Sequence, residues 1–287
     1  MKIKTTKKNI KFFAFFLFIF TTIQLVSAFP LFTSNKVETL IVLDNDKVTG
    51  LPNRFRDLTN LNISGSQQFT PSQIENIKNS IDKPDICIVD LRQESHGFIN
   101  DIAISFYARD KDLNNGFSTA ETIETENKLL NAIKLNSKID IYDKLGVVVK
   151  TVTVESVSNE SDEVAKYDLK YKRFAVKDGG IPSLTVVDDF IEFVKNKPED
   201  QHLHFHCDAG EGRTTTFMVL YQILNNESNL SLDQILSYQY NMGGIILTDD
   251  VDRAYFLNSF YDYVTENKND NFNIKFSDWV KNRVGGR

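Results

Sequence analysis

His206-Cys207-Asp208-Ala209-Gly210-Glu211-Gly212-Arg213-Thr214 is the most informative stretch of this 287-residue chain. It separates a cysteine from an arginine by five residues, two of them glycines, and a threonine follows the arginine. A strand-like run at 203–206 precedes it, and apolar residues at helical spacing follow it at Phe217, Leu220, Tyr221 and Leu224. Beside either of the two cysteines, such a match would arise by chance with a probability on the order of 10⁻⁴. The pattern predicts a functional loop between a strand and a helix.

The residue types of this loop suit phosphate chemistry. Glycines let successive backbone N–H groups point at one centre beside a helix N-terminus, which is a ready site for an anion. The same field favours the thiolate of Cys207 and makes it a nucleophile. Arg213 can grip two phosphoryl oxygens, and Thr214 can donate a hydrogen bond to the sulfur when the sulfur becomes a leaving group. We therefore expect Cys207, Arg213 and Thr214 to be catalytic.

The loop resembles the active-site signature of the protein tyrosine phosphatase superfamily. More narrowly, it resembles that of the cysteine phytases, the tyrosine-phosphatase-like inositol polyphosphate phosphatases of bacteria. Residues 62–66, 90–97 and 190–216 extend this resemblance, which covers most of the chain after about residue 50. It implies hydrolysis of myo-inositol hexakisphosphate (phytate) and lower inositol polyphosphates through a cysteinyl-phosphate intermediate, with no metal or other cofactor. It also implies a phosphate-binding loop made of Asp208, Ala209, Gly210, Glu211, Gly212 and Arg213.

This mechanism needs an acid that protonates the departing alkoxide, carried on a loop able to close over the substrate. Residues 177–182, Lys-Asp-Gly-Gly-Ile-Pro, match the acid loop of the resembled family at Asp178 and Pro182. The two glycines depart from the family, in which bulkier residues often precede the proline. We expect Asp178 to be the general acid, and the alternative is a turn residue in an Asp-Gly-Gly bend.

Weaker candidates for substrate contact surround these residues. Arg56 falls where the family presents an arginine to substrate, although Arg54 and Arg56 could also be a solvated pair. Lys177 and His206 belong to the two motifs. Gln239 aligns with a family glutamine that positions water, although an exposed helix residue would look the same. Four further residues are expected to brace the loop, touch substrate or add positive charge near it: Arg92, Glu94, His96 and Arg173.

Local patterns, together with the resemblance, predict an α/β fold with a tyrosine-phosphatase-like core, a mixed central sheet flanked by helices. Ser or Thr followed three residues later by Glu, Asp or Gln marks helix starts at Thr70, Ser118, Thr185 and Ser231, and a last helix is expected from about Asp250. Residues 85–90 and 203–206 are typical of buried strands.

A stretch of different character interrupts this pattern. Residues 147–154 and 167–172 are strand-like, and the polar residues 155–163 between them predict the loop of a hairpin. We therefore expect a core formed by residues 29–138 and 173–287, with a small inserted β subdomain at 139–172. The resemblance implies that this subdomain is a partial barrel, which could also recruit residues 37–50.

The first 28 residues read as a secretory signal peptide. Five lysines precede an unbroken apolar run at 12–20, and Val26-Ser27-Ala28 offers small residues for cleavage before Phe29. The alternative is a membrane anchor, but polar residues interrupt the run well short of the roughly 20 apolar residues that a spanning helix needs. We expect an exported protein, secreted or periplasmic, with no stable membrane insertion after cleavage.

Charge excludes nucleic acid as a partner and points to a small-molecule phosphorylated substrate held at a local site. The chain has 33 basic and 39 acidic residues, a formal net charge of −6. Cleavage would remove five lysines and no acid, which leaves 28 basic residues against 39 acidic ones and a net charge of −11. Such an acidic protein repels polyanions except at a basic pocket. Two acids on the loop itself, Asp208 and Glu211, could disfavour a polyanion further.

Several alternatives remain open on the sequence. A protein tyrosine, dual-specificity or phosphoinositide phosphatase is the second choice of function. His202, His204 and His206 alternate along one strand and could imitate the ligands of a metal-dependent hydrolase, although residues nearly 7 Å apart cannot all reach one ion. A non-catalytic module that binds phosphorylated ligands is a third possibility. Cys87 is expected to be buried and inert, or else to form a protective disulfide with Cys207.

Overall fold

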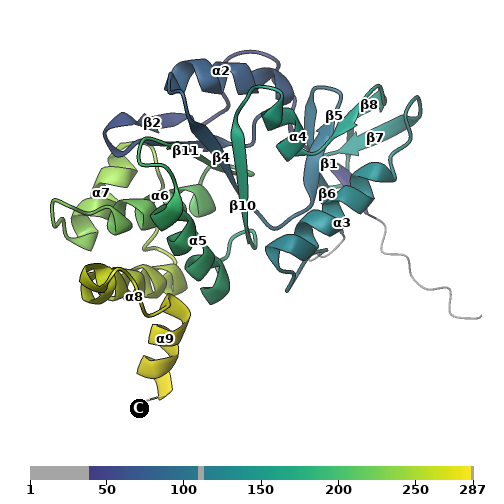
Figure 1. Cartoon of the computed structure of the whole chain (residues 1–287). Coiled ribbons are helices and arrows are strands. Elements are labelled where there is room, and N and C mark those ends of the chain that lie inside the picture. The colour runs from purple at the N-terminus through teal and green to yellow at the C-terminus, as the bar shows by residue number, and fades with distance from the viewer. Residues whose placement is uncertain (1–38, 109–112, 286–287) are drawn as a thin grey trace, which may run out of the picture. The chain divides into compact units, whose positions relative to one another are not determined.

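The computed structural model describes residues 39–108 and 113–285 (Figure 1). The predicted signal peptide at 1–28 lies outside these residues. Within the described ranges, none of the helices is both long enough and apolar enough to cross a lipid bilayer. The mixed α/β architecture confirms the predicted fold class, with strands in two sheets and helices packed against them.

A five-stranded sheet carries the predicted loop. Its order is β10 (Lys170–Val176), β4 (Ile86–Arg92), β11 (His202–Cys207), β3 (Ile63–Gln67) and β2 (Arg56–Leu58). The first four strands run parallel, and β2 pairs antiparallel with β3. Because β11 is central and covered on both faces, all six of its residues are buried, as its apolar and uncharged pattern predicts.

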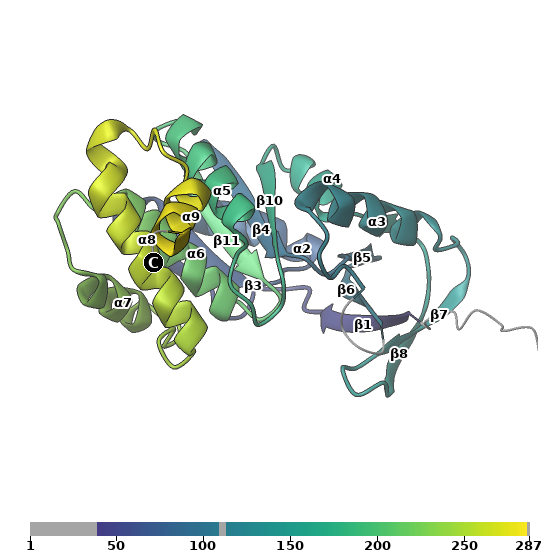
Figure 2. The same ribbon diagram turned by 90° about the horizontal axis from the view of Figure 1, so that it is seen from below.

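Helices cover both faces of this sheet (Figures 1 and 2). On one face lie α2 (Pro71–Ile81) and α4 (Glu160–Ala165), whose apolar residues pack with Ile86 and Ile88 of β4. The other face carries α5 (Leu184–Asn196), α6 (Gly212–Leu224), α7 (Leu232–Asn241), α8 (Val251–Asn267) and α9 (Phe276–Gly285). Alternation along β11 sends Leu203, Phe205 and Cys207 into this second core. On the opposite face, the His204 ring stacks on Phe55 and the His206 ring packs against Phe69 at a tilt.

A second, six-stranded sheet has the order β8 (Val148–Thr153), β7 (Lys138–Tyr142), β1 (Leu40–Asn45), β6 (Ile102–Tyr107), β5 (His96–Ile99) and β9 (Val157–Ser158). Leu130 of α3 (Thr119–Asn131) packs in its core. The strands cross the boundaries expected for an insertion at 139–172: β1, β5 and β6 come from outside it, and β10 begins inside it but belongs to the other sheet. The division into a core and an insertion stays a prediction.

The sequence pattern for helix starts was accurate where the capping side chain makes its expected hydrogen bond. Capping boxes are present at Thr70, Ser118 and Ser231, and Asp250 caps α8. The prediction at Thr185 was wrong by two residues, because Ser183 accepts the hydrogen bond from Val186 N and α5 begins before Thr185. Two further expectations were wrong: β9 and α4 occupy residues 155–163 in place of a hairpin loop, and α9 follows the helix that was expected to be last.

Candidate active site

The predicted site residues converge at one edge of the five-stranded sheet. Parallel strands end at the same edge, and this is where α/β proteins place their ligand sites. Cys207 is the last residue of β11, Glu94 follows β4 by two residues, and Asp178 follows β10 by two residues. The topology therefore brings together motifs that lie more than 100 residues apart in sequence.

The phosphate loop, residues 207–213, curls between β11 and α6. Thr214 Oγ1 donates to Cys207 Sγ at 3.1 Å, and Cys207 is almost completely buried. Gly210 has a positive φ of +71°, and a Cβ atom there would lie 2.5 Å from the backbone nitrogen of Gln67. Only glycine fits so close to the end of β3, which explains one of the two glycines in the pattern.

Arg213 is fixed by a carboxylate that the sequence marked only as a brace. Its Nη1 and Nη2 atoms donate to the two oxygens of Glu94 at 2.7 and 2.8 Å, and Nη1 also donates to Val176 O at 3.1 Å. Burial alone would raise the pKa of Glu94, but the charges of Arg213 and Arg92 hold it well below the usual value. Glu94 is therefore a carboxylate that presets the orientation of Arg213.

The acid loop, residues 177–182, lies beside Arg213. Asp178 Oδ1 accepts from Arg213 Nη2 at 2.9 Å, while more than half of the Asp178 side chain is exposed. Gly180 N donates to Lys177 O and closes a turn, and Gly179 within this turn has a φ of +70°. Lys177 lines a groove of about 730 Å³ between this loop and the N-terminal ends of α3 and α5. The predicted acid and lysine are thus next to the phosphate loop, and their roles stay predictions.

Arg56 is not a solvated residue. It is 6% exposed, and its guanidinium donates to Gly210 O at 3.0 Å and to Thr215 Oγ1 at 3.3 Å. Burial lowers the pKa of Arg56 to about 10, although the nearby Cys207 acts in the opposite direction. Arg54, by contrast, is exposed and pairs with Glu211. The two arginines have different tasks, and Arg56 holds the curled backbone of the phosphate loop.

Both acids of the phosphate loop have a cationic partner. Glu211 pairs with Arg54 at 2.7 Å, and Asp208 pairs with Lys144, which lies on the turn between β7 and β8. Burial would raise the pKa of Asp208, but the charges of Arg92 and Lys144 lower it below the usual value. No local pattern predicted a role for Lys144, since its partner lies 64 residues away. The negative rim that the sequence suggested is therefore largely neutralised.

His206 lies beneath the loop and not on its surface. It is fully buried, and its Nε2 lies 2.7 Å from Glu160 Oε1 of α4. His96 Nε2 lies 3.4 Å from Glu160 Oε2, on the same carboxylate. We therefore do not retain His206 as a substrate contact, because its imidazole is occupied in the core. Glu160 was missed by the sequence analysis, since nothing local distinguishes it from the surface acids that surround it in residues 155–163.

The three alternating histidines do not converge on one point. Ser64 Oγ lies 2.8 Å from both His202 Nε2 and His204 Nδ1, whereas His206 faces Glu160. A different group, Asp90, His96 and Glu160, brings three ligand-type atoms within 4.8 Å of one another. The two carboxylates already have protein partners: Tyr171 OH and Arg173 Nε bond to Asp90 Oδ2, and Gln68 Nε2 donates to Glu160 Oε2. His96 Nε2 lies 3.4 Å from both carboxylates and has no closer hydrogen-bond partner among the described residues. The group is thus a buried network of charges and hydrogen bonds.

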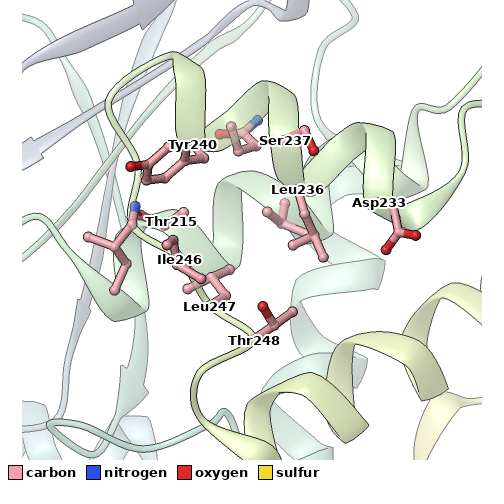
Figure 3. Close-up of a pocket in the computed structure, with 11 residues that line it drawn as sticks. Thr215, Asp233, Leu236, Ser237, Tyr240, Ile246, Leu247 and Thr248 are labelled. Atoms are coloured by element: carbon pink, nitrogen blue, oxygen red, sulfur yellow. Dashed lines mark hydrogen bonds between the residues drawn. The ribbon is translucent and has the colours of Figure 1, made fainter.

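Gln239 lies behind the phosphate loop. Its Nε2 donates to Gln222 Oε1 of α6 at 2.8 Å, and it lines a pocket of about 340 Å³ between α6, α7 and residues 245–248 (Figure 3). Thr215 is the one residue among 206–215, all of them described, that lines this pocket. Gln239 is buried and not an exposed helix residue, and its Oε1 has no hydrogen-bond partner among the described residues.

Cys87 is remote from Cys207. In the register of β4 and β11 it pairs with Leu203, four residues before Cys207. Four residues of strand span about 13 Å, whereas the Cα atoms of a disulfide lie at most about 7 Å apart. Burial raises the pKa of Cys87 to about 12, which keeps the thiol protonated and inert. The proposed protective disulfide does not fit this arrangement.

The sheet, the curled Cys-x5-Arg loop and the arginine-bound acid loop define the tyrosine phosphatase class of fold. A family model for PTP-like phytases, described by inositol hexakisphosphate, matches residues 89–225. A PTP-like phytase structure from Bdellovibrio bacteriovorus has 30% identity and a TM-score of 0.73, covering 85% of this chain and 95% of that one. The chain belongs to the PTP-like phytase family, which confirms the resemblance found in the sequence.

Further relatives are longer than this chain. The tandemly repeated PTP-like phytase of Mitsuokella multacida has 31% identity and a TM-score of 0.76, over 84% of this chain and 49% of that chain. A structure of a PTP-like myo-inositol phosphatase from the same organism contains myo-inositol-(1,3,4,5)-tetrakisphosphate. Effector protein hopD2 of Pseudomonas syringae is 25% identical over 77% of this chain and 52% of its own length. The chain thus spans about half the length of these relatives.

Proposed function

We propose that this chain hydrolyses phosphate monoesters of myo-inositol, namely phytate and lower inositol polyphosphates. The observation that carries the proposal is the arrangement of Cys207, Arg213 and Asp178 around one curled loop at the sheet edge. Family membership and the inositol tetrakisphosphate in the Mitsuokella relative support inositol phosphates as the substrate class.

The residues fit a two-step displacement. The Cys207 thiolate attacks phosphorus, the bond from phosphorus to the inositol oxygen breaks, and Asp178 gives its proton to that oxygen. Water then attacks the cysteinyl phosphate and gives a proton to the Asp178 carboxylate, so that orthophosphate leaves and the thiolate is restored. Arg213, held by Glu94, matches the negative charge of both transition states. Thr214 donates to the sulfur and stabilises it as a leaving group.

A polyanionic substrate is compatible with the charges around the loop. Because Asp208 and Glu211 are each paired with a cation, they contribute little net repulsion at the mouth. Arg56 lies against the phosphate loop, and Lys177 lies beside the acid loop. These local cations would attract a polyphosphate within a Debye length of roughly 10 Å, despite the acidity of the whole chain.

The substrate class is tested by comparing phosphate release from phytate, a phosphotyrosyl peptide and phosphoinositide vesicles under the same conditions. We expect kcat/KM on phytate to exceed that on the peptide by about 10-fold or more, since each tenfold step requires only about 1.4 kcal/mol of additional transition-state binding. A clear preference for the peptide or the vesicles would replace this proposal with a protein or lipid phosphatase. Release from none of the three would indicate a non-catalytic module.

We also propose that the protein is exported after cleavage following Ala28. The basic, apolar and small-residue segments of residues 1–28 support this, and the relatives are bacterial phytases and an effector. Mass spectrometry of the protein expressed from its full sequence in a bacterial host is expected to find Phe29 at the N-terminus in the exported fraction. Recovery of the chain with Met1 intact in the membrane pellet would show an anchor instead.

A further inference from the structure

Two arginines from different helices donate hydrogen bonds to the acid loop and to the end of the strand before it. Arg213 of α6 donates to Val176 O at 3.1 Å and to Asp178 Oδ1 at 2.9 Å. Arg253 of α8 donates through Nη2 to Gly179 O at 3.1 Å and to Gly180 O at 3.3 Å. The mechanism uses Arg213 and gives no task to Arg253, although both guanidinium groups contact the same short loop.

Arg253 is placed to act on this loop. It is 6% exposed, which is unusual for a cation that is always charged. Its guanidinium packs against Gly212 of the phosphate loop, where an added Cβ would lie 3.5 Å from Nη1. Asp250, the N-cap of α8, lies 3.7 Å from Nη2. Arg253 Nε has no hydrogen-bond partner among the described residues, so the two loop carbonyls are central to its hydrogen bonding.

The hydrogen bonds of Arg213 and those of Arg253 differ in whether they depend on the charge of Asp178. To act as an acid, Asp178 must be protonated, and a neutral carboxyl loses most of its attraction to Arg213. The incoming phosphate also competes for the Nη2 atom that contacts Asp178 in this structure. The contacts of Arg253 are made to backbone carbonyls, whose hydrogen-bonding capacity does not change with the protonation of Asp178.

The acid loop needs such an external contact because its own backbone is permissive. Gly179 has a φ of +70° with nothing within 4 Å of an added Cβ, and a second glycine follows it. Without an external contact, the segment that carries Asp178 would sample many conformations, and few of them would point the acid at the leaving oxygen. A contact at Gly179 and Gly180 restricts the backbone immediately after Asp178.

We propose that Arg253 is a positioning residue that holds the acid loop in place for proton transfer while Arg213 binds phosphate. Arg253 acts through Asp178 and does not itself contact the reacting atoms. This inference rests on the proposed function only in assigning the acid role to Asp178. It applies to any alkyl phosphate substrate.

The test compares leaving groups, because p-nitrophenolate departs with little help from an acid whereas an inositol alkoxide needs it. Arg253→Met is expected to lower kcat on phytate by about 10- to 100-fold and kcat on p-nitrophenyl phosphate by less than about 3-fold. Arg253→Lys, which can still donate to one carbonyl, should recover a large part of the loss. In an Asp178→Asn background, adding Arg253→Met should change kcat on phytate by less than about 2-fold.

Arg283→Met provides the matched control, because Arg283 is an exposed arginine of α9 that lies over the Trp279 ring. Thermal unfolding of all variants separates loss of fold from loss of positioning. Equal losses of kcat on both substrates, multiplying with the loss from Asp178→Asn, would overturn the proposal, as would a higher KM with unchanged kcat. Absence of phosphate release by the unmodified protein would instead reject the proposed function, which is a separate result.

Discussion

Cys207→Ser is expected to lower phosphate release from phytate by roughly 10⁴- to 10⁶-fold, the largest effect we predict. A serine hydroxyl is a far weaker nucleophile than a thiolate, and within residues 39–108 and 113–285 the side-chain hydrogen bond to Cys207 Sγ comes from a threonine and not from a base. Thr214 is a hydroxyl donor at 3.1 Å and cannot take up the proton of serine while it donates. Phosphate release measured over hours at high enzyme concentration would quantify the residual rate.

The matched control is the chain's other cysteine. Cys87 is buried at the far end of the neighbouring strand, so Cys87→Ala should leave kcat within about 3-fold of the unmodified protein. Calorimetric titration of phytate into the Cys207→Ser variant should still show binding, because Arg213, Arg56 and the loop backbone remain in place. If Cys207→Ser released phosphate as fast as the unmodified protein, the cysteinyl-phosphate mechanism would be wrong.

Glu160→Ala is expected to lower the free energy of unfolding by about 3–5 kcal/mol, the largest stability effect we predict. The Glu160 carboxylate is fully buried and accepts from Gln68 Nε2 while it faces His206 and His96. Its removal leaves these buried polar groups without their partner, which costs much more than the pair contributes. Urea denaturation followed by circular dichroism would measure the change.

Asp162, two residues further along α4, is the control for this variant. Its side chain is exposed in the first turn of the helix, so Asp162→Ala should cost less than about 1 kcal/mol. Equal costs for the two variants would show that the buried network contributes nothing special. Because Glu160 lies beneath His206 and not in the phosphate loop, residual folded Glu160→Ala protein should keep its preference among substrates.

In the unmodified protein, acidification should remove the stabilising contribution of the Glu160 carboxylate. Burial alone would raise the pKa of Glu160, but the charge of His206 and its hydrogen bond lower it well below the ordinary value. A carboxyl whose pKa is lower in the folded protein than in the unfolded chain stabilises the fold at pH values above the unfolded-state pKa. This contribution is lost as the pH falls through the folded-state pKa. The Glu160→Gln variant should therefore lose less stability on acidification than the unmodified protein.

The chemistry of the site could be predicted from the sequence because it is written in two short motifs. Cys207, Arg213 and Thr214 belong to one loop, whose glycines and helix start are local features. Asp178 was predicted as the acid in the same way, from its place ahead of a proline and a helix. Hydrogen bonds between close neighbours, such as the capping boxes of α2, α3 and α7, were predictable for the same reason.

The partners of charged residues could not be predicted, because they come from distant parts of the chain. Lys144 reaches Asp208 across 64 residues, and Glu160 reaches His206 across 46. Arg253 contacts the acid loop from a helix that begins more than 70 residues later. Each of these side chains looks like an ordinary surface charge in the sequence, and only the packing of distant segments shows which partner it has.

The sequence by itself identified the family and predicted Cys207 as the nucleophile and Arg213 as the phosphate-binding arginine, because a curled loop before a helix needs particular residues within a few positions of one another. Only the tertiary structure decided that Arg56 contacts Gly210, that Cys87 is out of reach of Cys207, and that Arg253 contacts the acid loop. These facts depend on strand register and helix packing, which bring residues together through the summed burial of many apolar side chains and not through any local pattern.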